Sequence, residues 1–260
     1  GSEMLQRLKR GEIWPLPGGG TADELVAVAR ELRMDFCFFD HWPGAPAKAK
    51  ALGLAAGAVV RGPWQRWMIE VGWQEAMLQM GRGTALMMIG LERATEQGRR
   101  EIDQWAASGV EMLLLADDVA YANGPWMSPQ QLEKVLLPLY RSLREQAGAA
   151  GLTVGFHTDG CVDAILPILH QADFQFYSLE PEGTDPLRAW QVLREPVPLF
   201  SGVPADWLIP GGFLPTREGR ILRNWLTAGP WTIKKKKKIN NPEARNTLRK
   251  IYQGLVCEIF

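Results

Sequence analysis

Carboxylate and imidazole side chains follow several short apolar runs of this chain, at positions where they could do chemistry. Asp118 comes just after the run at 112–115, His157 directly follows residues 152–156, and Glu180 closes a third run. Such groups can transfer protons, hydrogen-bond a substrate or ligate a metal. If the runs are neighbouring parallel strands, their ends meet at one edge of the sheet. We therefore predict a catalytic group of Asp118, His157 and Glu180.

Asp117 and Asp118 are adjacent, so in an extended strand their side chains would point to opposite faces. Only one of them can then face a pocket. We favour Asp118, which leaves Asp117 to face the helix layer or to cap a turn. The alternative interpretation is that both residues cap helices or loops.

A metal site is a second interpretation of the same region. His157, Asp159 and Glu180 could ligate zinc or another divalent metal through one nitrogen and several carboxylate oxygens. The structural alternatives are a buried histidine, an Asx turn at Asp159 and a salt bridge at the rim for Glu180. The 3 cysteines are widely spaced and include no CxxC pair, which excludes a structural zinc knuckle and a disulfide framework.

Other side chains near the expected strand ends are candidates for substrate binding. They are Arg61, Trp64, Gln65, Tyr121 and Ser201. Tryptophans such as Trp64 could line an apolar pocket for a flat ligand, although aromatic rings near a rim more often serve packing.

The elements that must position these residues alternate between strand and helix. Strands are expected at 13–16, 35–40, 58–61, 111–116, 152–156, 174–178 and 197–200, and within 231–239. Helices are expected at 21–32, within 45–54, at 67–107 with a break near 81–83, and at 128–150, 162–171, 185–193, 216–228 and 241–255.

Eight βα units in a chain of 260 residues predict an α/β fold, a single (β/α)8 TIM barrel that covers residues 1–260. The alternative is an open doubly wound sheet, but no GxGxxG motif follows the first expected strand. In a barrel, the active site lies at the C-terminal ends of the strands.

Composition restricts the class of protein. Hydrophobic residues make up 46% of the chain, so it can bury a large core. Lys+Arg and Asp+Glu are equal at 29 each, which disfavours nucleic acid as the main partner. No apolar run reaches the roughly 18 residues of a membrane span. The first two residues, Gly1-Ser2, resemble an expression scar. We expect a cytoplasmic protein that acts on a small molecule, and a homodimer is one oligomeric state open to it.

A run of five lysines, Lys234 to Lys238, does not fit the eighth strand, because unpaired ammonium groups are costly inside a packed barrel. The strand could be shorter, the run could be a loop that lines a wet pocket, or the segment could differ from the natural one.

Several motifs, in this order, resemble the uroporphyrinogen decarboxylase family, which includes related cobamide-dependent methyltransferases. The motifs are Leu115-Ala116-Asp117-Asp118, Gly124-Pro125-Trp126-Met127-Ser128-Pro129, Phe156-His157-Thr158-Asp159-Gly160, Leu179-Glu180-Pro181 and Ser201-Gly202-Val203-Pro204. The similarity is most specific from Leu113 to Gly212. It implies a (β/α)8 barrel and one of two chemistries, decarboxylation of uroporphyrinogen or zinc-dependent methyl transfer.

The chain departs from both patterns of that family. The decarboxylases of the family that this chain resembles have an arginine-rich loop after the first strand. This chain has Pro17-Gly18-Gly19-Gly20-Thr21 at that place, without an arginine. The thiol methyltransferases ligate zinc with His-x-Cys and a later Cys, whereas here Asp159 follows His157 and the lysine run occupies the later position. Without the cysteine thiolates, a zinc site in this chain would have to use imidazole and carboxylate ligands.

Three hypotheses follow from the residues and the resemblance. The first is a methyltransferase-like enzyme that works with a corrinoid protein or on a methylated small molecule. The second is a decarboxylase of uroporphyrinogen or a related acid, and the third is a non-catalytic barrel that binds a tetrapyrrole or corrinoid.

Overall fold

The computed structural model describes residues 21–31, 34–180, 183–193 and 197–201. The strands expected at 13–16 and 231–239, the helices expected at 216–228 and 241–255, and the lysine run lie outside the described residues.

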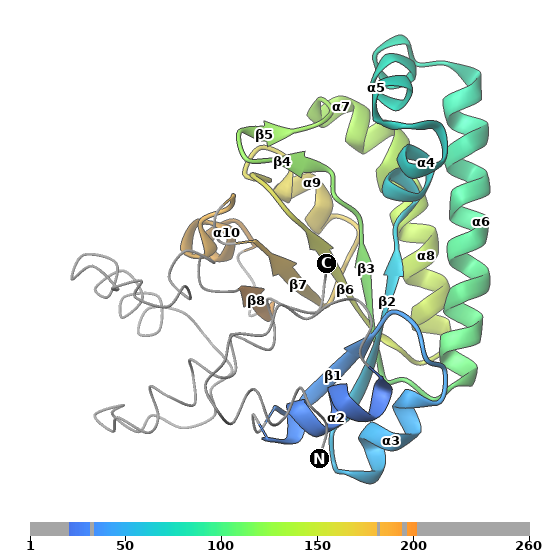
Figure 1. Cartoon of the computed structure of the whole chain (residues 1–260). Coiled ribbons are helices and arrows are strands. Elements are labelled where there is room, and N and C mark those ends of the chain that lie inside the picture. The colour runs from blue at the N-terminus through green and yellow to red at the C-terminus, as the bar shows by residue number, and fades with distance from the viewer. Residues whose placement is uncertain (1–20, 32–33, 181–182, 194–196, 202–260) are drawn as a thin grey trace.

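Six parallel strands form the central sheet, in the order β1-β2-β3-β6-β7-β8 (Figure 1). Their bounds are β1 Phe36–Phe39, β2 Ala55–Arg61, β3 Met112–Ala116, β6 Thr153–Thr158, β7 Phe176–Leu179 and β8 Leu199–Ser201. A short antiparallel hairpin, β4 Ala120–Tyr121 with β5 Gly124–Pro125, follows β3. These six strands correspond to the second to seventh of the expected strands.

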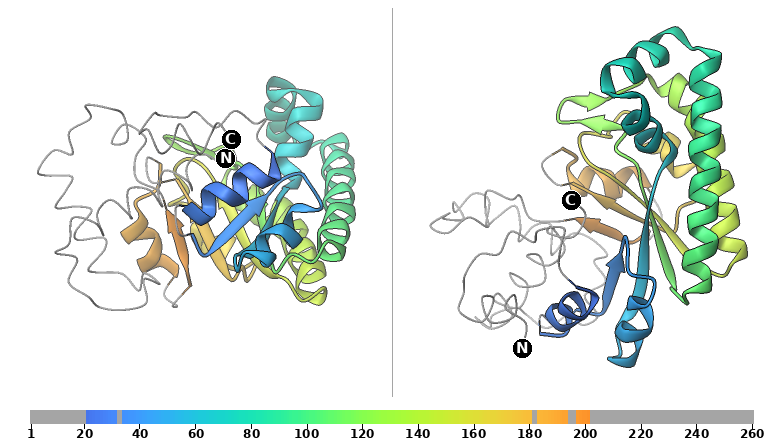
Figure 2. Two further views of the ribbon diagram at one scale, coloured as in Figure 1. Left: turned by 60° about the horizontal axis from the view of Figure 1, so that its bottom comes forward. Right: turned by 45° about the vertical axis from the view of Figure 1, so that its right-hand side comes forward.

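The helices connect the parallel strands, and α6 and α8 run along the outer side of the sheet (Figure 2). Their bounds are α2 Ala22–Glu31, α3 Ala45–Ala51, α4 Pro63–Val71, α5 Trp73–Arg82, α6 Ala85–Ala107, α7 Pro129–Gln131, the π-helical turn Leu132–Leu136, α8 Leu137–Ala149, α9 Leu166–His170 and α10 Pro186–Leu193.

Aromatic rings show how strongly the sheet curls. β1 and β8 stand at opposite ends of the strand order, yet the ring centroids of Phe36 and Phe200 are 5.3 Å apart. The rings of Phe38 and Phe176 are 6.3 Å apart. The sheet therefore forms a half-barrel with these rings on its inner side. This architecture is compatible with part of a TIM barrel, and closure into a full ring remains an expectation.

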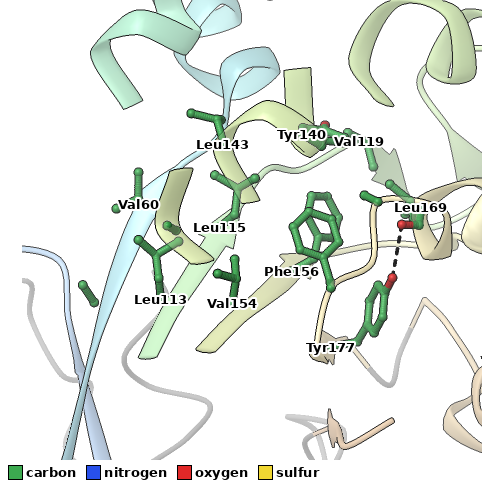
Figure 3. Close-up of a cluster of buried hydrophobic side chains, with 14 of the residues drawn as sticks. Val60, Leu113, Leu115, Val119, Tyr140, Leu143, Val154, Phe156, Leu169 and Tyr177 are labelled. Atoms are coloured by element: carbon green, nitrogen blue, oxygen red, sulfur yellow. Dashed lines mark hydrogen bonds between the residues drawn. The ribbon is translucent and has the colours of Figure 1, made fainter. Parts of the chain in front are cut away.

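The outer face of the sheet carries the main hydrophobic core, as Figure 3 shows. Leu113, Leu115 and Phe156 alternate along their strands and are at most 1% exposed. They pack against side chains of α8 such as Tyr140, whose ring centroid lies 5.1 Å from that of Phe156. Burial of each such side chain contributes about 1.5–3 kcal/mol. Because side chains alternate in a strand, the residues between them face the inside of the half-barrel.

Several element bounds differ from those expected from the sequence. β6 extends to Thr158, so His157 lies within the strand. The helix expected at 67–107 begins earlier, at Pro63, and has an additional break at Gly72, while the break expected near 81–83 is confirmed at Gly83. Gly83 has φ +61°, the left-handed conformation in which glycine commonly ends a helix. The helix expected at 162–171 begins only at Leu166.

None of the helices in the described ranges combines the length and apolar character that a membrane span needs.

Candidate functional site

Asp117 joins the end of β3 to the start of α4. Its carboxylate accepts hydrogen bonds from the backbone N–H groups of Trp64 (3.0 Å) and Gln65 (2.6 Å) and from the Tyr140 hydroxyl (2.7 Å). The first N–H groups of a helix have no partner within the helix, so Asp117 acts as a cap from another strand. The structure thus places Asp117 toward the helix layer.

Burial sets the protonation behaviour of this cap. Burial raises the pKa of Asp117 to about 7. The hydrogen bonds from Gln65, Tyr140 and Trp64 lower this pKa, but their effect is smaller than that of burial. The charge of Asp118 raises this pKa further. The pKa of Tyr140 is raised in turn by burial and by the adjacent carboxylate of Asp117, so the tyrosine keeps its proton and remains a donor.

Asp118 faces the other way, toward the end of β6. Its Oδ2 accepts from Nε2 of Gln65 at 2.7 Å, and its Oδ1 accepts from the backbone N–H of Asp159 at 3.2 Å. The pKa of Asp118 is raised by burial and by the charge of Asp159, while the Asp159 N–H, His157 and Arg61 lower it. Two carboxylates therefore lie close together in a partly dry environment.

His157 stands beside Ala116 of β3 and Ser178 of β7 in the strand register. It is 5% exposed. Its Nδ1 lies 3.1 Å from the Ser178 hydroxyl, and its Nε2 lies 3.4 Å from Oδ1 of Asp159. The serine fixes the ring so that Nε2 faces the carboxylates. Ser178 was not among the site residues expected from the sequence. The only feature that marks it in the sequence is a hydroxyl side chain between the apolar residues Tyr177 and Leu179.

Asp118, His157 and Asp159 form the group that could hold a metal ion. One ligand atom from each residue lies within 4.8 Å of the other two. An imidazole and two carboxylates suit zinc, manganese or iron better than a soft thiophilic metal. Burial and then the charge of Asp159 raise the pKa of Asp118, and a divalent cation would offset the repulsion from Asp159. The donor set therefore fits a divalent metal, with Asp118 in the place where the sequence suggested Glu180.

Glu180 lies beside this group but contacts the loop after β6. Its Oε2 accepts from the backbone N–H of Gly160 at 3.2 Å. The buried Thr184 donates to the Gly160 carbonyl at 2.8 Å and accepts from the Val162 N–H at 3.0 Å. Both side chains hold the residue that follows Asp159. Sequence reasoning missed Thr184, which lies four residues after Glu180 with no pattern that marks it.

The remaining candidates for substrate binding occupy different places. Arg61 ends β2 and is exposed, and Gln65 binds Asp118 through its amide. The side chain of Trp64 is fully buried, with its ring 5.6 Å from that of Trp67, so only its backbone N–H takes part in this network. Ser201 donates to the Leu179 carbonyl at 3.1 Å.

Tyr121 lies on the hairpin beside the site and is 43% exposed. Its ring stacks on that of Trp126 with centroids 4.8 Å apart. Its carbonyl accepts from the Cys161 N–H at 2.9 Å. Gly160 has φ +77°, and a Cβ there would lie 2.6 Å from the backbone nitrogen of Tyr121. Glycine at this position thus lets the hairpin pack on the loop that carries Asp159.

Comparison with known proteins gives a likeness of fold. No protein-family model and no curated protein sequence matches the chain. Fourteen solved chains match, among them a methyltransferase from Methanosarcina mazei with a TM-score of 0.61 and 15% sequence identity. The alignment covers 82% of this chain and 62% of the methyltransferase, so the chain spans less than two thirds of that protein's length. At this identity the match shows a shared architecture.

Proposed function

We propose that the chain is a methyltransferase-like enzyme of the uroporphyrinogen decarboxylase family that holds a divalent metal at Asp118, His157 and Asp159. It would move a methyl group from a methylated small molecule to a corrinoid carried by a partner protein. The convergence of these three side chains at the C-terminal edge of the sheet carries the proposal. The fold shared with a methyltransferase supports it.

The metal would supply Lewis-acid activation of a substrate oxygen or nitrogen. The residues around it hold the ligand atoms in place. Gln65 fixes Asp118 through its amide, Ser178 fixes the ring of His157, and the Asp159 N–H ties the two carboxylate-bearing segments together. Partners of this kind orient ligands and tune their basicity.

Methyl transfer from an ether illustrates what the site must achieve. The C–O bond would break with its electron pair remaining on oxygen, which would take up a proton from water to become a hydroxyl. A cob(I) corrinoid on the partner protein would be the methyl acceptor and would supply the electron pair for the new bond to carbon. An alkoxide is a poor leaving group, so charge stabilisation or protonation at the oxygen is required. His157 is buried and Asp118 is partly buried, so a metal held between them would stabilise the charge on that oxygen in a partly dry environment.

Two measurements on the same preparations test the proposal. The first is zinc, manganese and cobalt binding by titration and elemental analysis. The second is the spectral change from cob(I)alamin to methylcob(III)alamin with a panel of methyl ethers and methylamines. We expect one tightly bound divalent ion and transfer from at least one donor, both reduced at least tenfold in Asp118→Asn and Asp159→Asn. Asp173→Asn is the matched control, since this exposed residue pairs with Arg144 away from the site.

Failure of the wild-type chain to bind any of the three metals would remove the metal site, and failure of transfer with every donor would remove the methyltransferase assignment. Turnover of uroporphyrinogen would instead favour a decarboxylase. Stoichiometric binding of a tetrapyrrole without turnover would favour a non-catalytic barrel.

A further inference from the structure

Gln65 binds two neighbouring carboxylates that serve opposite faces of the sheet. Its backbone N–H donates to Oδ1 of Asp117 at 2.6 Å, and its side-chain Nε2 donates to Oδ2 of Asp118 at 2.7 Å. Both aspartates directly follow β3, so the first turn of α4 is bound to the end of that strand through both of them. A shift of this turn relative to Asp117 would therefore move the amide that holds Asp118.

Close packing fixes the position of the first turn of α4 against β3. The Gly62 N–H donates to the Ala116 carbonyl at 2.6 Å, and the Trp64 N–H donates to Oδ2 of Asp117 at 3.0 Å. A Cβ at Gly62 would lie 2.3 Å from Cγ of Asp117, so glycine at this position leaves room for the carboxylate. The ring of Trp64 is fully buried and anchors the turn in the core.

Tyr140 lies on α8 and contacts Asp117 from the outer side of the sheet. Its hydroxyl donates to Oδ2 of Asp117 at 2.7 Å, the oxygen that also accepts from Trp64. The tyrosine is fully buried, and its ring centroid lies 5.1 Å from that of Phe156 on β6. A donor held in a close-packed core restricts the rotation of the carboxylate that it binds. Tyr140 thus sets the orientation in which Asp117 receives the N–H of Gln65.

We propose that the buried Tyr140 is a positioning residue for the candidate metal site. It orients Asp117, which fixes the first turn of α4, and Gln65 in that turn holds the metal ligand Asp118. This inference rests on the proposed function for the presence of the metal. The loss of a group that orients a ligand in this way typically weakens metal affinity tenfold to a hundredfold, and a group one contact further away should have a smaller effect.

Zinc affinity in a double-mutant cycle on the full chain tests this path. Tyr140→Phe removes the hydroxyl and keeps the ring, whereas Gln65→Met removes the amide donor and keeps the backbone N–H that binds Asp117. We expect Gln65→Met to weaken zinc binding at least tenfold and Tyr140→Phe to weaken it about threefold to tenfold. Because Tyr140 acts through the amide of Gln65, adding Tyr140→Phe to Gln65→Met should weaken binding no further.

Tyr177→Phe is the matched control for the loss of a buried tyrosine hydroxyl. The hydroxyl of Tyr177 donates to the Leu169 carbonyl at 3.2 Å and so binds β7 to α9. Both substitutions should lower the melting temperature, whereas zinc affinity should fall only in Tyr140→Phe. The absorption spectrum of the Co(II)-loaded protein, which reports ligand geometry, should change in Tyr140→Phe and stay as wild type in Tyr177→Phe.

The proposal is overturned if Tyr140→Phe binds zinc as tightly as wild type, or if its effect multiplies with that of Gln65→Met. Equal losses of zinc affinity in Tyr140→Phe and Tyr177→Phe would also overturn it, because the loss would then follow from lower stability. A wild-type chain that binds no zinc contradicts the proposed function itself, and the same titrations distinguish that result from a failure of the path through Gln65.

Discussion

The carboxylates of Asp117 and Asp118 are adjacent in the chain and serve opposite faces of the sheet. Asp117 binds the start of α4 and the hydroxyl of Tyr140. Asp118 binds the side chain of Gln65 and the backbone of Asp159 on the inner side. One residue thus fixes the strand end to its helix, and the other joins the candidate metal group. The distinction follows from strand alternation that continues two residues past the end of β3 at Ala116.

The buried cap should make stability depend on pH. The pKa of Asp117 is raised from 3.8 to about 7, so between these values the folded chain binds more protons than the unfolded chain. Stability from this residue is therefore fully present below pH 4 and falls as pH rises toward 7, by on the order of 4 kcal/mol. Urea unfolding at several pH values should show this slope, and Asp117→Asn should lack it.

Asn at position 117 should also lower stability by about 1–3 kcal/mol at pH 5, because its amide nitrogen cannot accept a hydrogen bond, whereas both oxygens of the protonated aspartic acid can. An Asp117→Asn chain that keeps the wild-type pH slope would show that another group causes it.

The inner packing of the half-barrel depends on glycine at position 155. A Cβ there would overlap the ring of Phe176. We expect Gly155→Ala to lower the free energy of unfolding by about 1–3 kcal/mol, the usual cost of overpacking. Adding Phe176→Leu should recover part of the loss. The control is Gly148→Ala in α8, where the new methyl group meets only Arg144 at 3.7 Å; equal losses from both substitutions would contradict the packing account.

Ser178 should act on the metal through His157. Ser178→Ala removes the hydroxyl 3.1 Å from Nδ1, and loss of such a partner typically weakens metal affinity tenfold to a hundredfold. Thermal stability should change little. Ser142→Ala is the matched control, because that hydroxyl donates to the Leu139 carbonyl on α8. Unchanged zinc affinity in Ser178→Ala would show that the ring of His157 is held by other contacts.

Thr184 should position Asp159 through the intervening loop. Its hydroxyl binds both Gly160 and Val162, so Thr184→Val leaves a buried N–H and a buried carbonyl without that partner, at a cost of about 1–3 kcal/mol. Zinc affinity should fall as the loop relaxes. Thr184→Ser keeps the hydroxyl and should restore affinity. If the serine variant binds zinc as weakly as the valine variant, the hydroxyl is not what positions the loop.

Within the described residues, the sequence predicted the order of elements well, because apolar runs that end in polar residues indicate parallel strands. It also placed Asp118 and His157 at one edge, since strand ends converge in a parallel sheet. The break near 81–83 was predicted correctly, whereas the start at Pro63 and the break at Gly72 were not, because the helical pattern is nearly continuous there.

The partners within the site could not be predicted from the sequence. Glu180 and Asp118 both follow apolar runs, and only the loop geometry at Gly160 decides which carboxylate joins the group. Trp64 lies next to the site in the chain, yet its ring packs against Trp67 because α4 turns it into the core. The choice of carboxylate and the burial of the Trp64 ring depend on contacts between residues far apart in the chain, which the pattern of neighbouring residues does not predict.

Zinc affinity of Glu180→Gln compared with Asp118→Asn tests the central claim most directly. Glutamine keeps an oxygen for the Gly160 N–H, so the loop should stay in place. With Asp118 in the metal group, Asp118→Asn should weaken zinc binding by at least a hundredfold while Glu180→Gln stays within a few fold of wild type. The reverse order, with zinc lost in Glu180→Gln and retained in Asp118→Asn, would contradict the account.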